Sequence, residues 1–278
     1  MIINHNISAM NSYRNLASVN ERVDKTMEKL SSGLRINRAG DDAAGLAISE
    51  KMRAQIKGLN MATKNSQDGI SMIQTAEGAL NETHSILQRM RELAVQSAND
   101  TNTSEDREKL QLEMNQLRLE VDRISTSTEF NTRKLLTGEY NEGGLVFHIG
   151  ANKDQNVKFQ VADMGATNLG IAGATEEEAI SISTQADANN AIKTVNDALE
   201  RVSVERAKFG ALQNRLEHTI NNLRVSGENL QASESRIRDA DMADEMVGLN
   251  KDKIISQSGT AMLAQANTTP QNVLQLLR

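Results

Sequence analysis

A seven-residue repeat of apolar side chains is the sequence feature that most constrains the fold of this chain. The repeat occupies residues 189–237 and consists of Val195, Val202, Phe209, Leu216, Leu223, Leu230 and Ile237. Because an α-helix turns once in about 3.6 residues, this spacing places the seven side chains on one stripe of a single helix. At roughly 1.5 Å per residue that helix would be about 70 Å long. It therefore needs partner helices to cover its apolar stripe.

The composition favours long packed helices with an aliphatic core. Aromatic residues make up 2% of the 278 residues, and the chain has 17 Gly and a single Pro. These values fit helices better than a β-sandwich or an α/β enzyme. Cys is absent, which excludes disulfides, thiolate metal sites and Cys nucleophiles.

Charge and hydropathy exclude two further classes of partner. The net charge is −6 and no basic run occurs, which argues against nucleic acid and anionic membranes as partners. No run of about 18 apolar residues is present, and the N-terminus lacks the pattern of a secretory signal. We expect a soluble chain that does not use the general secretory route.

Two further helices are predicted in the N-terminal half. Residues 43–98 carry a second seven-residue repeat, with Asp41 or Asp42 placed to cap the helix: Met52, Leu59, Ser66, Ile73, Leu80, Leu87 and Ala94. A turn at 99–103 leads into a helix over 104–129, with Ser104, Glu105 and Asp106 as its cap and acidic first turn. Its stripe is Leu110, Met114, Leu117, Val121 and Ile124. The short turn predicts that it returns antiparallel to the second helix.

The helical period disappears between residues 137 and 186, where apolar and polar residues alternate. Leu145, Phe147 and Ile149 share one phase, and Val157, Phe159 and Val161 share it after a Gly- and Asn-rich turn. This alternation predicts a β-hairpin. We expect the hairpin to cap one end of the helical bundle, with a short strand near 179–183 beside it.

The two ends of the chain carry weaker apolar stripes. The stripes comprise Ile3, Ile7, Val23, Met27, Leu30 and Leu34 in the N-terminal segment, and Met246, Leu249, Met262 and Leu263 in the C-terminal segment. Asn is frequent in the first, so its helix should be marginal alone and ordered by tertiary or intermolecular packing. A frayed terminus is the alternative on periodicity alone. Thr269 and Pro270 predict a helix restart, and the likeness of the two ends predicts that they pair.

No constellation of residues points to catalysis. The four His lie in separate predicted elements, and the zinc-protease, phosphate-loop and Ser-nucleophile motifs are missing from the sequence. We therefore predict no catalytic residue, no metal site and no cofactor. Charged bands such as Lys51, Arg53 and Lys57 are read as solvated helix faces, or alternatively as surfaces that set register between subunits.

Several long blocks of the sequence resemble bacterial flagellin. Residues 27–52, 65–71 and 74–80 resemble the N-terminal core of that family, and residues 213–223, 232–242 and 273–278 resemble its C-terminal core. The resemblance implies a mainly α fold: a long antiparallel helical bundle plus a two-helix coiled coil formed by the paired N- and C-termini. The bundle would be a three-helix outer core with a small β-hairpin region.

The resemblance also implies a domain organisation. Residues 1–42 and 239–278 would form the inner core domain that lines the channel of a filament. The outer core domain would comprise N-terminal helices over 43–136, a hairpin region over 137–186 and a C-terminal helix over 187–238. Large variable outer domains are missing between the two cores, so the resemblance implies a thin filament.

The function implied by the resemblance is that of a structural subunit that polymerises into the flagellar filament for motility. The implied partners are copies of the same chain, a flagellar export chaperone, and filament cap and junction proteins. Export would use the flagellar type III apparatus, and the protein would be extracellular. Arg89, Leu93 and Glu113 match residues that bind a surface immune receptor of animals, while Leu274, Leu276 and Leu277 match those read by a cytosolic immune sensor.

Three other functions compete with this interpretation. A hook–filament junction adaptor shares similar termini but fewer of the C-terminal blocks. An enzyme displayed on the filament would need an inserted domain, and the region over 137–186 is too short for one. A lone coiled-coil scaffold explains the heptads but neither the hairpin nor the paired ends.

Overall fold

The computed structural model describes residues 6–141, 143–172 and 180–276, and for 270–276 the backbone alone. The described helices are α1 (Ile7–Ser32), α2 (Ala43–Ser97), α3 (Ser104–Ser127), α4 (Ala166–Leu169), α5 (Gln185–Arg238) and α6 (Met242–Leu276). The strands are β1 (Glu129–Phe130), β2 (Arg133–Lys134), β3 (Leu145–His148) and β4 (Asn156–Phe159). The prediction of a mainly α fold is confirmed. None of the described helices combines the length and the hydropathy that a membrane crossing requires.

The chain divides into two compact units. Unit 1 comprises residues 1–56 and 228–278, and unit 2 comprises residues 57–227. Each unit has its own packing.

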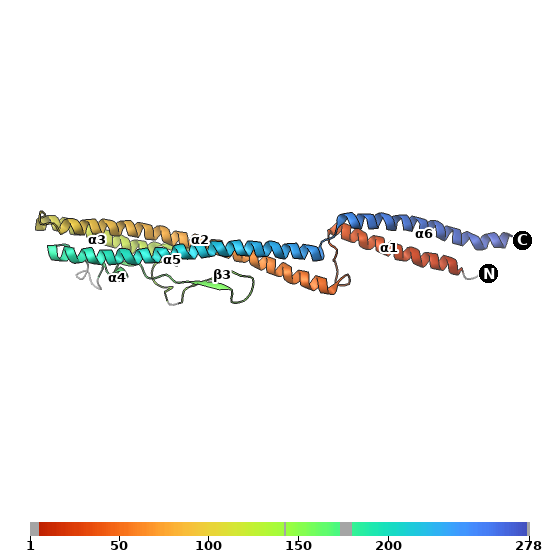
Figure 1. The fold of residues 1–278 in the computed structure, drawn as a ribbon, viewed down its shortest axis with the longest axis horizontal. Helices are drawn as coiled ribbons and strands as arrows, with labels where there is room; N and C mark the ends of the chain where they lie inside the picture. The colour runs from red at the N-terminus through yellow and green to blue at the C-terminus, as the bar shows by residue number, and fades with distance from the viewer. Residues whose placement is uncertain (1–5, 142, 173–179, 277–278) are drawn as a thin grey trace. The chain divides into compact units, whose positions relative to one another are not determined.

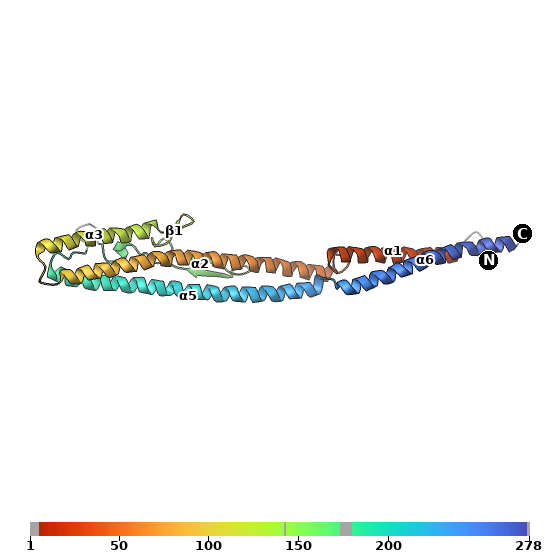
Figure 2. The same cartoon turned by 90° about the horizontal axis from the view of Figure 1, so that it is seen from above.

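In unit 2, the two predicted heptad stripes meet in one core. Ile73, Leu80 and Leu87 of α2 and Val195, Val202 and Phe209 of α5 are fully buried in the same apolar cluster. The two helices run antiparallel alongside each other in both views (Figure 1, Figure 2). Their stripes thus cover one another, as the sequence predicts.

The third helix of unit 2 begins at a capping box. The Thr103 hydroxyl accepts a hydrogen bond from the N–H of Asp106, whose carboxylate accepts one from the Thr103 N–H. The cap is therefore Thr103, one residue before the predicted Ser104. Met114 and Val121 are fully buried in the cluster with α2 and α5. The three-helix arrangement expected from the sequence is present.

The β3–β4 hairpin is antiparallel, with Leu145 opposite Phe159 and Phe147 opposite Val157. It lies along α2 and α5 rather than over the end of the bundle, which differs from the prediction (Figure 1). The reason is the apolar face of the hairpin: the Phe159 ring packs edge-on against Phe209, with their centroids 5.1 Å apart. Gly69 allows this approach, since a Cβ there would be 3.3 Å from the Phe147 ring.

Unit 2 contains one hairpin that the sequence analysis did not predict, and the described part of one predicted strand is not a strand. β1 and β2 pair in a second small hairpin directly after α3. The described part of the expected strand near 179–183 is not a strand. Its backbone is instead held by side chains: the Ile182 N–H donates to Gln111 Oε1, and its carbonyl accepts from the Ser97 hydroxyl.

In unit 1, α1 and α6 lie side by side as an antiparallel pair (Figure 1, Figure 2). The predicted pairing of the two ends is confirmed. α1 ends at Gly33, whose φ of 71° is the left-handed conformation that glycine adopts readily. The helix restart predicted at Pro270 is wrong, because α6 continues through that residue to Leu276.

Candidate assembly surface

The seam between α1 and α6 is the first feature of the candidate surface in unit 1. Leu16, Val19 and Val23 of α1 and Leu249, Ser256, Gly259 and Leu263 of α6 are the half-buried or buried positions that line it. With Asp252, which is also half-buried, the spacing alternates between three and four residues on both helices, as in a coiled coil. Among the described residues of the seam, Val19 and Leu249 alone fall to 6% exposed. The seam is therefore thinly apolar.

Polar contacts align the two helices along the seam. The guanidinium of Arg22 lies 3.1 Å from the carboxylate of Asp252, and Lys29 Nζ lies 3.0 Å from Glu245 Oε1. On the N-terminal side of Arg22 along α1, the Ser256 hydroxyl donates to the Asn20 side-chain oxygen at 3.0 Å. Because each contact joins fixed positions on the two helices, the set specifies antiparallel register more than it adds stability.

Asn6 explains why α6 passes through Pro270 unbroken. A proline has no backbone N–H, so the carbonyl four residues earlier, that of Ala266, loses its helical partner. The Asn6 side-chain amide donates to that carbonyl at 2.8 Å. The side-chain oxygen of Asn6 meanwhile accepts from the N–H of Ala9 and caps α1. One side chain thus begins α1 and supplies the hydrogen bond that α6 lacks.

Backbone and ionic contacts join the C-terminal end of α1 to the segment that connects α5 with α6. Leu34 and Asp239 form a β-bridge, and the Ala240 N–H donates to the Gly33 carbonyl at 3.0 Å. The guanidinium of Arg238, 9% exposed, lies 2.5 Å from a Glu50 carboxylate oxygen. These contacts tie the ends of α1 and α5 together.

Most of the large apolar side chains of α1 and α6 lie outside the seam and are exposed. We call this set the outer apolar faces: Ile7, Met10, Tyr13 and Met27 of α1, and Met242, Met246, Val247, Ile254, Ile255 and Met262 of α6. Val247 and Ile254 are seven residues apart and are 69% and 66% exposed, on the side of α6 away from the seam. An exposed apolar surface of this kind marks an interaction site.

The structure sorts the sequence-predicted stripe into two groups. Val23, Leu30, Leu34, Leu249 and Leu263 are buried or half-buried, whereas Ile7, Met27, Met246 and Met262 are exposed. Ile3 and Leu277 lie outside the described residues, as do the side chains of Leu274 and Leu276. The prediction missed Val247 and Ile254, because it followed one stripe on α6 and these residues form another on the opposite side.

The predicted receptor residues lie on the α2–α3 surface of unit 2. Arg89 Nε donates to Glu113 Oε1 at 2.9 Å, and its Nη1 donates to Glu92 at 3.1 Å. The hydrogen bond that Arg89 donates to Glu113, followed by the one that it donates to Glu92, raises the pKa of Arg89. Leu93 is 0% exposed and belongs to the apolar core beneath them. The structure therefore brings Arg89 and Glu113 together at the surface and leaves Leu93 inside.

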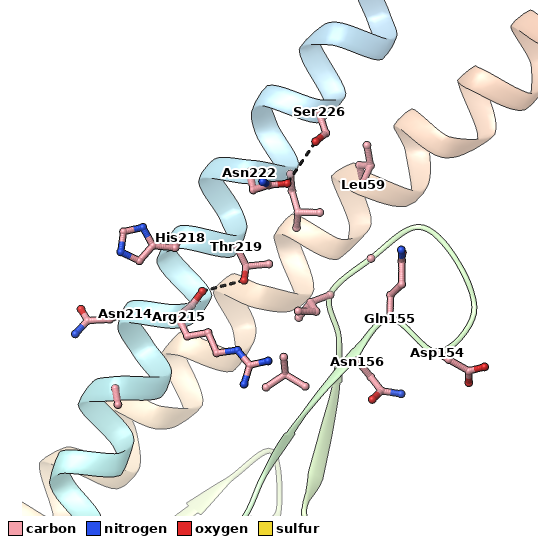
Figure 3. A pocket seen from close by; sticks show the side chains of 15 residues that line it. Leu59, Asp154, Gln155, Asn156, Asn214, Arg215, His218, Thr219, Asn222 and Ser226 are labelled. Atoms are coloured by element: carbon pink, nitrogen blue, oxygen red, sulfur yellow. Dashed lines mark hydrogen bonds between the residues drawn. The ribbon is translucent and has the colours of Figure 1, made fainter.

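A groove lies between the tip of the β3–β4 hairpin and α5 (Figure 3). Amide and hydroxyl groups make up much of its wall, and Arg215 extends toward the hairpin (Figure 3). Its acidic group is Asp154 and its imidazole is His218. In the part of the chain that the structure describes, no cluster of three or more His, Asp or Glu could hold a metal ion.

Comparison with known proteins gives matches over most of the chain. Residues 3–141 match the family described as the bacterial flagellin N-terminal helical region, and residues 192–277 match the bacterial flagellin C-terminal helical region. Over the whole of both chains, the sequence is 56% identical to a flagellin of Bacillus subtilis (strain 168). It is 53% identical to the flagellar filament 33 kDa core protein of Treponema phagedenis, again over the whole of both chains.

A solved structure is also similar to this fold. The crystal structure of Bacillus cereus flagellin matches with a TM-score of 0.50 and 30% sequence identity. The match covers 58% of this chain and 88% of that one.

Proposed function

The chain belongs to the bacterial flagellin family, and from that premise we propose how it works. It is a structural subunit that polymerises into the flagellar filament for motility. The family is a structural one. Relatives that match over their full length are flagellins and filament core proteins, and no comparison favours a junction adaptor over a filament subunit.

The outer apolar faces of α1 and α6 carry the proposed mechanism of polymerisation. Val247 and Ile254 remain exposed after α1 and α6 have paired, so the apolar surface that they present is available to another copy of the chain. Removing this surface from water would stabilise the contact between subunits by roughly 25 cal/mol per Å² of apolar area. We propose that each subunit places these faces against its neighbours, and that the thin seam becomes stable when they are covered.

The domain assignment and export route follow from the same proposal. Residues 1–42 and 239–278 form the inner core domain that lines the filament channel, and residues 43–238 form the outer core domain. The subunit leaves the cell through the flagellar type III apparatus, held by an export chaperone, and meets cap and junction proteins at the filament ends. The thin seam supports this route, since a helix pair with few buried apolar side chains opens readily for passage.

The α2–α3 surface is our proposed site for a surface immune receptor of animals. Arg89 and Glu113 form its exposed ion pair, and buried Leu93 acts by holding α2 in place beneath Arg89. The C-terminal Leu274, Leu276 and Leu277 are proposed for the cytosolic immune sensor. In a receptor-binding assay, the Arg89→Ala variant should bind with lower affinity. The Arg123→Ala variant, which breaks an exposed ion pair within α3, should bind as the unmodified chain does.

Seeded polymerisation of the purified full chain tests the proposed function. Val247→Asp and Ile254→Asp should each prevent growth, because assembly would then bury an unpaired carboxylate. Gln257→Asp places the same charge on an exposed polar position of the same helix and is the matched control. Circular dichroism should show equal helix content in all three variants.

Two results would contradict the proposal. One is normal polymer growth by both apolar-to-Asp variants. The other is polymerisation by a chain that lacks about 35 residues from either end, since that truncation removes much of the outer apolar faces.

A further inference from the structure

The methionines of this chain are distributed unevenly between its two units. In unit 1, five of the described methionines are exposed, namely Met10, Met27, Met242, Met246 and Met262, and Met52 is half-buried. In unit 2, Met72, Met90, Met114 and Met164 are buried, and Met61 is the exposed one among the described residues. Met262 is 64% exposed, whereas Met90 is 0% exposed. Half of the outer apolar faces is thus made of thioether side chains.

A thioether is apolar and also oxidisable, which sets Met apart from the Leu, Ile and Val that could occupy the same positions. Its sulfur lone pair attacks one oxygen of hydrogen peroxide, an S–O bond forms and the O–O bond breaks. The sulfur loses two electrons to become the sulfoxide, and the peroxide's other oxygen leaves as hydroxide and takes a proton to give water. Since the chain has no Cys, these thioethers have no thiol competing for the oxidant.

We propose that the five exposed methionines of unit 1 are an oxidation-sensitive control of assembly, with hydrogen peroxide as the oxidant. The inference rests on the proposed function, because it requires the outer apolar faces to be covered by neighbouring subunits. Oxidation adds a polar S=O group to each side chain. In an assembled contact, that oxygen would be buried without a hydrogen-bond donor, which disfavours the contact.

The free subunit and the polymer respond differently to the oxidant in this proposal. The folds of both units survive, because the five side chains lie outside the seam and the four methionines of the unit 2 core are at most 6% exposed. In the polymer, the five thioethers are covered and react slowly. Methionine sulfoxide reductases reduce the sulfoxide with electrons from a dithiol, which becomes a disulfide as the oxygen leaves as water, and this returns the subunit to the assembly-competent form.

The first experiment maps oxidation of the purified full-length subunit. The monomer and the preformed polymer are treated with hydrogen peroxide and analysed by peptide mass spectrometry. We expect the five exposed methionines of unit 1 and Met61 to gain oxygen in the monomer, while Met90 and Met114 do not. In the polymer, the oxidation rate of these five side chains should be about one tenth of the rate in the monomer, or lower. Equal rates in monomer and polymer, or equal rates at buried and exposed methionines, would overturn the proposal.

The second experiment measures polymerisation after oxidation. The critical concentration of the oxidised subunit should rise by about tenfold or more. A variant with all five exposed methionines of unit 1 changed to Leu should keep the same critical concentration after peroxide treatment. Met61→Leu is the matched control and should remain as sensitive as the unmodified sequence. Methionine sulfoxide reductases A and B together, one for each sulfoxide epimer, should restore assembly of the oxidised unmodified chain when supplied with a dithiol reductant.

The outcomes separate this inference from the function on which it rests. An oxidised chain that assembles at an unchanged critical concentration overturns the inference and leaves the filament function intact. An untreated chain that never polymerises overturns both. If the five-Leu variant fails to assemble even without peroxide, the reductase experiment decides: recovery supports the proposal, and no recovery contradicts it.

Discussion

Unit 1 and unit 2 are both built from long amphipathic helices, yet they bury these helices to very different extents. Among the described residues of unit 1, the buried apolar side chains are Val19, Ile36 and Leu249. Unit 2 buries the α2 stripe from Ser66 to Ala94 and the α5 stripe from Val195 to Leu223, and α3 and the β3–β4 hairpin pack against the same core. The apolar surface of unit 1 is instead mostly exposed on its two terminal helices.

This difference shows what each unit needs in order to be stable. A helix in a three-helix core gains its stability from neighbours within the same chain. A helix pair leaves more than half of each helix surface uncovered, so polar contacts such as Arg22–Asp252 set its register and another molecule must supply the missing burial. Unit 2 is therefore a self-sufficient fold, and unit 1 is suited to assembly.

The largest effect should come from truncating the core of unit 2. Leu216 is 0% exposed, and Leu216→Ala should lower the free energy of unfolding by about 2–5 kcal/mol through lost burial and a residual cavity. Chemical denaturation followed by circular dichroism measures this change. Leu119→Ala on exposed α3 is the control and should change it by less than about 0.5 kcal/mol. Equal losses in the two variants would show that the stripe is not the core.

A matched truncation in unit 1 should act locally. Leu249→Ala removes one of the few buried side chains of the seam and should cost about 2 kcal/mol, at the low end for such a change, because the site borders solvent. Hydrogen exchange should accelerate in α1 and α6 while the α2–α5 core keeps its protection. If the unit 2 amides lose protection equally, the stability of unit 2 is not independent of the α1–α6 seam.

The Asn6 contact allows a finer test of the helix pair. Asn6→Asp keeps a capping oxygen for α1 but loses the donor to the Ala266 carbonyl, and should destabilise the pair by about 1 kcal/mol. Pro270→Ala restores a backbone N–H for that carbonyl, so the same substitution should cost less in that background. Hydrogen exchange of the α6 amides provides the measurement. An equal cost in both backgrounds would mean that Pro270 does not create the need for Asn6.

The smallest effect concerns the stability of unit 2 at acid pH. The hydroxyl and N–H of Thr103 donate to the Asp106 carboxylate and hold its pKa below its ordinary value of 3.8. The stabilisation that this cap provides is fully present above about pH 3.8 and is lost as pH falls through the lower pKa of the folded state. Asp106→Asn should flatten this part of the stability profile. A titration by NMR that finds no lowered pKa would contradict it.

The sequence predicted the unit 2 bundle closely because strong periodicity leaves few alternatives. Seven-residue repeats over 43–98 and 189–237 specify helices and also which side of each is buried. The hairpin was found from alternation, but its place along α2 and α5 was not. That place depends on the Phe159–Phe209 contact and on the absence of a Cβ at Gly69, neither of which is visible as a local pattern.

The assembly surface was only partly predictable. Both terminal helices carry apolar residues on more than one side, so the sequence could not say which side pairs within the chain. The structure assigns Leu249 and Leu263 to the seam, and Met262, next to Leu263, to the exposed face. Helical spacing could have revealed Val247 and Ile254 as a second stripe on α6.

By itself, then, the sequence determined the helical class, the two long stripes of unit 2, the hairpin and the likeness of the two ends. Each of these features follows from a pattern of apolar residues that can be read within a single segment of the sequence. The tertiary structure alone decided the face on which α1 and α6 meet, the passage of α6 through Pro270 with the help of Asn6, and the exposure of unit 1's methionines. These features require residues more than 200 positions apart to come into contact, and no local pattern records such contacts.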